Sequence, residues 1–378
     1  MPSFDIVKKS ETSSSFRCRS VIDQFDLNKY EEEVREEFSG EIKAEKDGCW
    51  NIGVIYGNSG TGKSTIANKL YSDYIFKGIN SDKRKPTVEI MPQDAEIKEI
   101  SKTFNSVGFS SPPSWIKPYN VLSTGEKMRV NLAYCMLKSD DLFVFDEYTS
   151  TVNRDVAKIG SCAIQKAVRR RGKKFIAVSC HTDVLDWLEP DWTFCTDDMT
   201  YREYSGDRHR RPEINIEIKK ERGKWDMFRK YHYLSHTICP TSHQYVGYYN
   251  NRPMCFCSVL HHPSQGKTSI KRISRLVVLP DYQGVGIGRK LLTKISEKYF
   301  SYGNRVRIIT SNPALLHSLK NHEKWYLTEK KRQKTEHTGA ERFKSGGWSS
   351  GKRTTYHWEF YDEALKKEKG ETTMGDEV

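Results

Sequence analysis

The sequence predicts an α/β protein with two domains, and three observations support this fold class. The chain has 378 residues, which is enough for two hydrophobic cores at about 100–200 residues per domain. In each half, an apolar run leads into a Gly-rich turn and then a helical stretch, as in α/β proteins. The charge balance changes near residue 200, from 28 Lys and Arg against 30 Asp and Glu in residues 1–200 to 31 against 13 in residues 201–360.

Composition excludes several classes of protein. Apolar residues make up 36% and aromatic residues 12% of the chain, which is too much for a disordered protein. No apolar run approaches the roughly 20 residues of a membrane-spanning helix, and the polar N-terminus lacks the apolar region of a secretory signal. The nine Cys are scattered and odd in number, which is typical of free thiols in a reducing compartment. We therefore expect a cytoplasmic protein of a bacterial, archaeal or phage-infected cell, with no membrane association.

The first Gly-rich turn has the pattern of a phosphate-binding loop. It follows the apolar run 51–56 and precedes the helical stretch 66–71. Its glycines allow main-chain amides to surround phosphate oxygens at a helix N-terminus. Lys63 would reach the β- and γ-phosphates, and Ser64 would offer its hydroxyl to Mg²⁺. The predicted ATP-binding residues of this loop are Gly57, Asn58, Ser59, Gly60, Thr61, Gly62, Lys63, Ser64 and Thr65.

Four further segments supply polar groups in a fixed order along the chain. Gln93 is placed as a water-positioning amide, and Leu122–Glu126, called here the signature segment, opens a helical stretch that offers a second anion site. The apolar run 142–145 ends in Asp146, a candidate ligand of Mg²⁺, and Glu147, a candidate base for water. A second apolar run, 175–179, is followed by His181, which could donate to a γ-phosphate.

This order of motifs resembles the nucleotide-binding domain of ABC ATPases over residues 15–200. The resemblance implies that Lys63, Ser64, Gln93 and Asp146 bind MgATP, with Ser64, Gln93 and Asp146 around the metal, and that Glu147 and His181 are catalytic. It also implies an ATP-dependent homodimer, in which Ser123 and Gly125 complete the ATP site of a second protomer. Two departures stand out: Thr124 adds bulk in the signature segment, and residues 148–153 match the usual loop after the catalytic Glu only loosely.

The second half predicts a different mixed sheet. Residues 214–218 alternate as a strand, 225–233 read as a helix, and 244–249 with 254–260 form a hairpin. A strand at 273–279 leads through a Gly-rich turn into a helix at 290–300. A strand at 305–310, a helix ending at Trp325 and a last strand at 354–361 complete the order.

This order resembles GNAT acetyltransferases over residues 212–362. The resemblance implies an acyl-CoA site, with acetyl-CoA as donor, in which loop amides at a helix N-terminus hold the pyrophosphate and the preceding strand holds the pantetheine arm. One departure is the missing Tyr that protonates the leaving thiolate, for which His317 or Ser318 could substitute. The implied acyl-CoA-binding residues are Leu276, Val277, Val278, Gln283, Gly284, Gly286, Gly288 and Arg289.

The basic charge of the second half indicates a polyanionic acceptor, with DNA favoured over RNA. Aromatic residues in 225–233 could stack on an extruded base, or they could be core packing. A faint similarity to phage Mom-type DNA-modification proteins suggests Tyr231 and Arg275 as acceptor-binding residues and His232 and Tyr233 as catalytic ones, with His232 as general base. The His and Cys residues between 232 and 257 match no usual zinc spacing, and buried packing is the alternative.

Together these observations predict an ABC-type P-loop nucleotide-binding domain (1–205), an α/β GNAT domain with a mixed central sheet (206–362), and an acidic flexible tail (363–378). The whole architecture resembles fusions of an ABC-type ATPase with a predicted acetyltransferase. The expected function is ATP-dependent N-acyl transfer to nucleic acid, with base amines of DNA as the favoured acceptors. Two alternatives stay open: an ATP-gated nucleic-acid clamp whose GNAT fold is inert, and an ATP-regulated acetyltransferase acting on protein or small amines.

Overall fold

The computed structural model describes residues 3–11, 13, 15–26, 33–45, 48–204, 214–232, 236–262, 269–333 and 353–364. It is mixed α/β, as predicted. The chain divides into two compact units: Met1–Asn80 with Tyr134–Pro212, and Ser81–Ala133 with Glu213–Val378. Residues 205–213, where the predicted boundary between the two domains falls, and the tail beyond residue 364 lie outside the described residues.

The first unit is built on a five-stranded sheet with the strand order β4-β5-β3-β6-β7. Strand β3 pairs in parallel with β5 and β6, β4 pairs in parallel with β5, and β7 is antiparallel to β6. The carboxyl ends of β3, β4 and β5 therefore share one edge of the sheet, where the predicted ATP-site segments begin. The strands are β3 (Ile52–Tyr56), β4 (Leu142–Phe145), β5 (Lys174–Ser179), β6 (Trp192–Cys195) and β7 (Thr200–Glu203).

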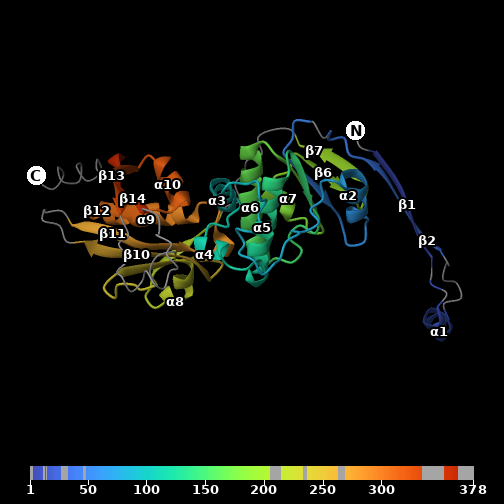
Figure 1. Ribbon diagram of the computed structural model, residues 1–378, viewed down its shortest axis with the longest axis horizontal. Coiled ribbons are helices and arrows are strands. Elements are labelled where there is room, and N and C mark those ends of the chain that lie inside the picture. The colour runs from blue at the N-terminus through green and yellow to red at the C-terminus, as the bar shows by residue number, and fades with distance from the viewer. Residues whose placement is uncertain are drawn as a thin grey trace, which may run out of the picture. The chain divides into compact units, whose positions relative to one another are not determined.

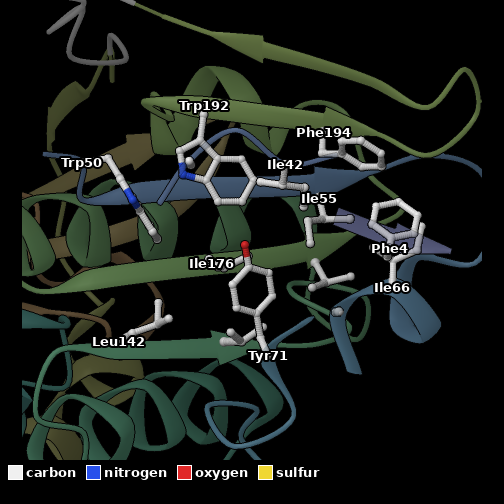
Figure 2. Close-up of a cluster of buried hydrophobic side chains, with 14 of the residues drawn as sticks. Phe4, Ile42, Trp50, Ile55, Ile66, Tyr71, Leu142, Ile176, Trp192 and Phe194 are labelled. Carbon is white, nitrogen blue, oxygen red and sulfur yellow. The ribbon is translucent and has the colours of Figure 1, made fainter. Parts of the chain in front are cut away.

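Buried apolar side chains pack tightly around β3. Ile55 from β3, Ile66 from helix α2 (Lys63–Tyr71) and Ile176 from β5 belong to one core cluster, and all are fully buried (Figure 2). Trp192 meets Trp50 edge to face, with ring centroids 5.4 Å apart. This packing fixes the strand and the helix that flank the phosphate-binding loop, and so gives that loop rigid ends. Helices α6 (Arg154–Arg171) and α7 (Val184–Leu188) complete the unit.

A long β-hairpin extends from this core. Strand β1 (Ser3–Glu11) pairs antiparallel with β2 (Glu33–Glu41), and helix α1 (Phe16–Gln24) lies at the far end of the hairpin (Figure 1). Phe4 and Phe38 anchor its base, since both are buried and Phe4 contacts Phe194 edge to face. This hairpin was not predicted from the sequence.

The second unit contains a seven-stranded sheet with the order β13-β14-β12-β11-β10-β9-β8. Only β11 and β12 are parallel; every other pair is antiparallel, so the sheet is mixed as predicted. The hairpin predicted at 244–260 is present as β9 and β10. The strands are β8 (Glu217–Lys220), β9 (His243–Tyr249), β10 (Arg252–His262), β11 (Ile270–Val278), β12 (Arg305–Thr310), β13 (Trp325–Gln333) and β14 (Arg353–Phe360).

Helices cover both faces of this sheet. Helix α8 (Trp225–Phe228) packs against Phe256 of β10, whereas α9 (Ile287–Ser301) contacts the opposite face through Tyr299, which hydrogen bonds to Tyr245 (Figure 1). The short helices η2 (Arg229–Tyr231) and η3 (Pro280–Tyr282) and helix α10 (Pro313–Lys320) complete this part.

The parallel strands β11 and β12 separate part-way along their length. Their register runs from Ile270 opposite Arg305 to Ile273 opposite Ile308, whereas β11 stays paired with β10 as far as Val278. A bulge occurs in the β10–β11 pair, where Ser258 faces Arg275 and Val259 faces Ile273, so that Ser274 is the extra residue. Residues 274–278 therefore present the edge that faces away from β10 to the space between the separating strands.

Residues 81–133 form a compact helical segment of the same unit. The rings of Phe104 and Phe109 meet edge to face at 5.1 Å, and Trp115 donates its indole N–H to the carbonyl oxygen of Phe109 at 2.7 Å. The segment contains α3 (Ile97–Ser106), α4 (Pro112–Trp115), η1 (Tyr119–Val121) and the first residues of α5 (Thr124–Lys138).

Two local expectations were wrong. Regular strand structure begins at Glu217 rather than at residue 214, and the helix predicted to end at Trp325 ends at Lys320, so that Trp325 opens β13. Of the two alternatives for the aromatic residues in 225–233, core packing holds for Trp225 and Phe228, which are buried against Phe256. Among the residues that the structure describes, no helix has both the length and the apolar character needed to span a bilayer.

Candidate functional site

The phosphate-binding loop connects β3 to α2. Gly62 caps α2 with a left-handed backbone (φ 81°), and Gly60 also has a positive φ of 88°. Lys63 donates from Nζ to the carbonyl oxygen of Asn58, so its ammonium lies over the loop where phosphates are expected. Thr61 donates from Oγ1 to the same carbonyl at 2.9 Å. The loop thus has the backbone and the cation that phosphate binding requires.

Two residues from the β6–β7 turn hold this loop. Asp197 accepts from the backbone amide of Asn58 at 2.8 Å and from its side-chain amide at 3.2 Å. The hydroxyl groups of Thr196 and Thr61 lie 2.5 Å apart. Sequence reasoning missed both residues, because they are separated from the loop by more than 130 positions and belong to no recognised motif.

The segments that carry Asp146, Glu147 and His181 are joined by hydrogen bonds. Asp146 directly follows β4 and accepts from the backbone amide of Glu147 at 2.9 Å, while the Glu147 side chain is exposed. Ser179 Oγ donates to the carbonyl of Tyr148 at 3.1 Å and accepts from the amide of His181 at 3.1 Å. This connection holds the candidate base and the candidate γ-phosphate donor on adjacent strand ends.

The loop after Glu147 is held in an uncommon backbone conformation. Glu147 and Thr149 have φ values of 53° and 64°, which are costly for residues with a side chain. Arg154 donates to Thr149 Oγ1 at 3.2 Å, pairs with both carboxylate oxygens of Asp183, and lies 4.9 Å from the ring of Trp187. Arg154 therefore connects this loop to the segment after His181. The sequence motifs did not predict this contact.

The signature segment begins α5 with a capping box. Ser123 Oγ accepts from the amide of Glu126 at 3.2 Å, and Glu126 Oε2 accepts from the amide of Ser123 at 3.1 Å. Glu126 Oε1 also accepts from Ser114 Oγ at 3.0 Å. Gln93 is exposed in a turn before α3. Gln93, Ser123 and Gly125 belong to the unit that does not contain the phosphate-binding loop.

A cavity of about 330 Å³ opens where β11 and β12 separate. Its walls come from β11, the turn before α9, the end of β12, the start of α10, η2 and the segment at 105–112. The structure brings to this cavity every described residue that was predicted for acyl-CoA or acceptor binding, namely Tyr231, His232, Arg275, Leu276, Val277, Val278, Gln283, Gly284, Gly286, Gly288 and Arg289. Tyr233 lies outside the described residues.

The donor side of this cavity fits a pyrophosphate and a pantetheine arm. Gly286 caps α9 with φ 86°, and a Cβ added there would meet no atom within 4 Å, so the first amides of α9 face open space. The edge of β11 beyond Ile273 offers main-chain groups to an extended ligand. Arg289 also lines the cavity and supplies a positive charge near this helix start.

The acceptor side contains a buried histidine. His232 is 7% exposed, and its ring lies 5.8 Å from that of Trp225. The ammonium groups of Lys230 and Lys117 lie 5.0 and 5.8 Å from the centre of the Tyr231 ring. Arg275 donates to the carbonyls of Ser274 and Thr237, each at 2.7 Å, and so holds the chain that follows η2.

Helix α10 presents a serine to this cavity. Ser318 is among the lining residues, whereas His317 is exposed and its carbonyl accepts from the Asn321 side chain at 3.0 Å. Tyr282, from the turn before α9, also lines the cavity and was not predicted. Of the two substitutes proposed for the missing tyrosine, Ser318 is the one that lines the cavity.

A resident metal cluster does not occur in the part of the chain that the structure describes, where no three His, Cys, Asp or Glu side chains gather closely enough to hold an ion. A site for Mg²⁺ built from Ser64 and Asp146 needs no such cluster, because Mg²⁺ is commonly held by one or two carboxylates together with substrate phosphates. Ser64 at the start of α2 and Asp146 after β4 therefore fit MgATP, with the phosphates completing the coordination.

Comparison with known proteins gives a family match for part of the chain. Residues 182–325 match the model of the acetyltransferase (GNAT) family. A search of curated proteins found no match. Among solved structures, a dimeric ATP-binding cassette in a post-hydrolysis state bound to ADP and Pi is 12% identical (TM-score 0.39), over 54% of this chain and 98% of the cassette. A dimeric bacterial ABC transporter cassette is 14% identical (TM-score 0.36), over 47% and 94%.

A bacterial Atm1-family ABC exporter with ATP bound is 18% identical, with a TM-score of 0.32, and this chain covers 32% of it, or about a third of its length. These TM-scores are low, so the reading of the N-terminal half depends on its motifs and strand order. The family match confirms the predicted GNAT fold in the C-terminal half. The chain therefore contains a segment that matches the GNAT acetyltransferase family model, and its N-terminal half carries motifs that resemble those of ABC-type ATPases.

Proposed function

We propose that this protein is an ATP-hydrolysing ABC-type ATPase fused to an acyl-CoA-dependent N-acyltransferase. One observation carries the proposal: the loop that would hold pyrophosphate and the buried His232 line the same cavity, at the place where β11 and β12 separate. A donor thioester bound along β11 would then lie within reach of an acceptor amine beside His232.

The chemical step is aminolysis of a thioester. The amine nitrogen attacks the carbonyl carbon, the N–C bond forms, and the C–S bond breaks. His232 accepts the proton that the amine loses, and Ser318 passes a proton from solvent to the departing thiolate, so that coenzyme A leaves as a thiol. His232 then returns its proton to solvent. Both side chains line the same cavity, which supports these two roles.

ATP hydrolysis would occur at the edge of the first sheet. Lys63 would bind the β- and γ-phosphates, Ser64 and Asp146 together with Gln93 would surround Mg²⁺, and Glu147 would deprotonate water. His181 would donate to the γ-phosphate. In the proposed homodimer, the signature segment of one protomer, with Ser123 and Gly125, closes the ATP site of its partner.

Nucleic acid is the acceptor that the charge distribution favours, with a base amine of DNA as the acyl acceptor. Residues 201–360 contain 31 Lys and Arg but only 13 Asp and Glu. A basic surface of this kind binds phosphates with release of counterions, so DNA affinity should fall by at least about tenfold between 50 and 200 mM salt. A flat salt response would contradict this choice of acceptor.

The decisive assay is mass spectrometry of nucleosides after incubation with ATP, acetyl-CoA and either duplex DNA or tRNA. We expect an added acetyl mass on one deoxynucleoside, lost in the variant His232→Ala. Hydrolysis of ATP without any adduct on either polymer would refute nucleic-acid acylation. Acetylation of a lysine peptide in a parallel reaction would then identify a protein or small-amine acetyltransferase.

A clamp function is the second candidate, and one observation favours it. Helix α10 presents Ser318 to the cavity, whereas many GNAT enzymes have a tyrosine on this helix. The departing thiolate therefore lacks that tyrosine as its proton donor. An ATP-gated clamp with an inert GNAT fold would show ATP-dependent DNA retention and no transfer of acetyl to any acceptor.

A further inference from the structure

Part of the acyl-CoA cavity is formed by the helical segment 81–133. Asn105, Ser110, Ser111 and Pro112 line the cavity together with the turn before α9. These residues lie between the predicted Gln93 and the signature segment, and they belong to the same compact unit as the seven-stranded sheet. The donor site is therefore composite, with a wall supplied by a segment that precedes the GNAT-like part by about a hundred residues.

Arg129 of α5 fixes the turn that would hold the pyrophosphate. Its guanidinium is fully buried and donates from Nη2 to the carbonyl of Asp281 at 2.7 Å and from Nη1 to the carbonyl of Gln283 at 3.0 Å. Nη1 also lies 3.3 and 3.2 Å from the carbonyls of Val107 and Gly108. Hydrogen bonds from a buried cation to carbonyls are stronger than neutral ones, so this contact determines where the turn lies.

Gln283 makes a second connection between the same elements. Its side-chain carbonyl accepts from the amide of Ser110 at 2.7 Å, and its side-chain amide donates to the carbonyl of Val278 at 2.7 Å. The residue predicted to touch acyl-CoA thus bridges strand β11 and the helical segment. Lys117 adds a third connection through its contact with the ring of Tyr231, on the acceptor side.

The other end of this connection is the signature segment. Arg129 follows Glu126 by one helical turn, and Glu126 closes the capping box with Ser123 and accepts from Ser114. Because the α-helix is stiff over this distance, a ligand that fixes Ser123 also fixes Arg129. ATP held between two protomers would contact α5 at its first turn, whereas acyl-CoA would contact the turn that Arg129 holds.

We propose that Arg129 is a positioning residue for the turn before α9, called here the acyl-CoA turn. We also propose that Arg129 couples acyl-CoA binding to ATP binding at the signature segment. This inference rests on the proposed function. ATP bound at the signature segment would restrict the motion of α5 and, through Arg129, of the acyl-CoA turn. Because the turn is then already ordered, acyl-CoA binding loses less conformational entropy, and ATP tightens it. Linkage requires that acyl-CoA tighten ATP binding by the same factor.

The test is titration calorimetry of coenzyme A into the full-length protein, with and without the non-hydrolysable analogue AMP-PNP. For the unchanged protein we expect AMP-PNP to lower the Kd of coenzyme A by at least about fivefold. Arg129→Lys keeps the charge but loses the planar fork, and should raise this Kd by about tenfold and reduce the AMP-PNP effect below about twofold. Gln283→Met, which leaves Arg129 intact, should also weaken the coupling.

Lys102→Met is the matched control, because Lys102 is an exposed cation on α3 of the same segment. It should bind coenzyme A as the unchanged protein does, with the same AMP-PNP effect. If the unchanged protein binds coenzyme A but AMP-PNP leaves its Kd unaltered, the coupling is refuted and the acyltransferase proposal stands. If it binds no coenzyme A under either condition, both fail. If folded Arg129→Lys and Gln283→Met proteins retain full coupling, the positioning role is refuted.

Discussion

Gly108 offers a direct test of the close approach between the helical segment and the acyl-CoA turn. A Cβ at this position would lie 2.1 Å from Arg129 Nη1 and 2.5 Å from the carbonyl oxygen of Gln283, and Gly108 has φ 81°. The left-handed backbone costs a residue with a side chain about 1–2 kcal/mol. Overpacking against a fixed backbone adds about 1–3 kcal/mol. We therefore expect Gly108→Ala to lower the free energy of unfolding of the second unit by about 2–5 kcal/mol.

Gly223→Ala is the matched control for the backbone cost. Gly223 lies in the same unit with φ 83°, but a Cβ there would meet no atom within 4 Å. Gly223→Ala should lower the free energy of unfolding only by the backbone cost of about 1–2 kcal/mol. The free energies of unfolding of the two variants should therefore differ by about 1–3 kcal/mol. Urea unfolding followed by tryptophan fluorescence measures the difference, because Trp115, Trp225 and Trp325 report on this unit.

Coenzyme A binding supplies the second measurement on the same pair. Gly108→Ala should raise the Kd of coenzyme A by about tenfold or more, since the Gln283 carbonyl must move, while Gly223→Ala should leave it unchanged. Equal stability and equal affinity of the two variants would show that Gly108 does not approach the turn as closely as described.

Three further predictions address the ATP site, the acyl-CoA cavity and the buried carboxyl group of Asp281. Glu147→Gln should reduce ATP hydrolysis by at least about 100-fold and elute as a dimer in the presence of ATP by size-exclusion chromatography with light scattering; a variant that stays monomeric with ATP would contradict the two-protomer site. Gly286→Val should fill the open space before α9 and weaken coenzyme A binding by at least about tenfold in calorimetry, with unchanged ATP hydrolysis; unchanged binding would place the pyrophosphate elsewhere. Burial raises the pKa of Asp281, nearby Glu126 raises it further, and Arg129 opposes the shift. The unfolded state releases this proton near pH 4, whereas the folded state retains it to a higher pH. The free energy of unfolding therefore falls as pH rises from about 4 through the folded-state pKa of Asp281. Asp281→Asn should remove this loss, so its melting temperature relative to the unchanged protein should increase from pH 4.5 to pH 7; a constant difference would contradict the assignment.

The local parts of both sites could be predicted from the sequence because their chemistry is contiguous. Residues 57–65 contain the strand end, the glycines, the lysine and the helix start that phosphate binding needs, and the structure arranges them as β3, loop and α2. Residues 276–289 likewise contain the strand, the turn and the start of α9. In both places, a Gly with positive φ at the helix start is the local feature that the pattern reports.

The long-range parts could not be predicted. Asp197 reaches Asn58 across 139 positions, and Arg129 reaches Gln283 across 154, so no spacing in the sequence relates them. The aromatic run at 225–233 was ambiguous because its period fits both an exposed stacking surface and a buried face. The structure buries Trp225 and Phe228 against Phe256, since α8 has to cover the sheet face that β10 presents.

The same distinction explains the departure of the signature segment from the usual ABC pattern. A Glu at position 126, in place of the usual Gln, accepts two hydrogen bonds at once, from the amide of Ser123 and from the hydroxyl of Ser114. Both donors are satisfied by one buried carboxylate, which joins the start of α5 to α4. Since α4 begins at Pro112, which lines the acyl-CoA cavity, the residue that departs from the pattern is also a link between the signature segment and the cavity wall. Under the proposed function, Glu126 would let a motif that binds ATP also help to position the acyl-CoA site.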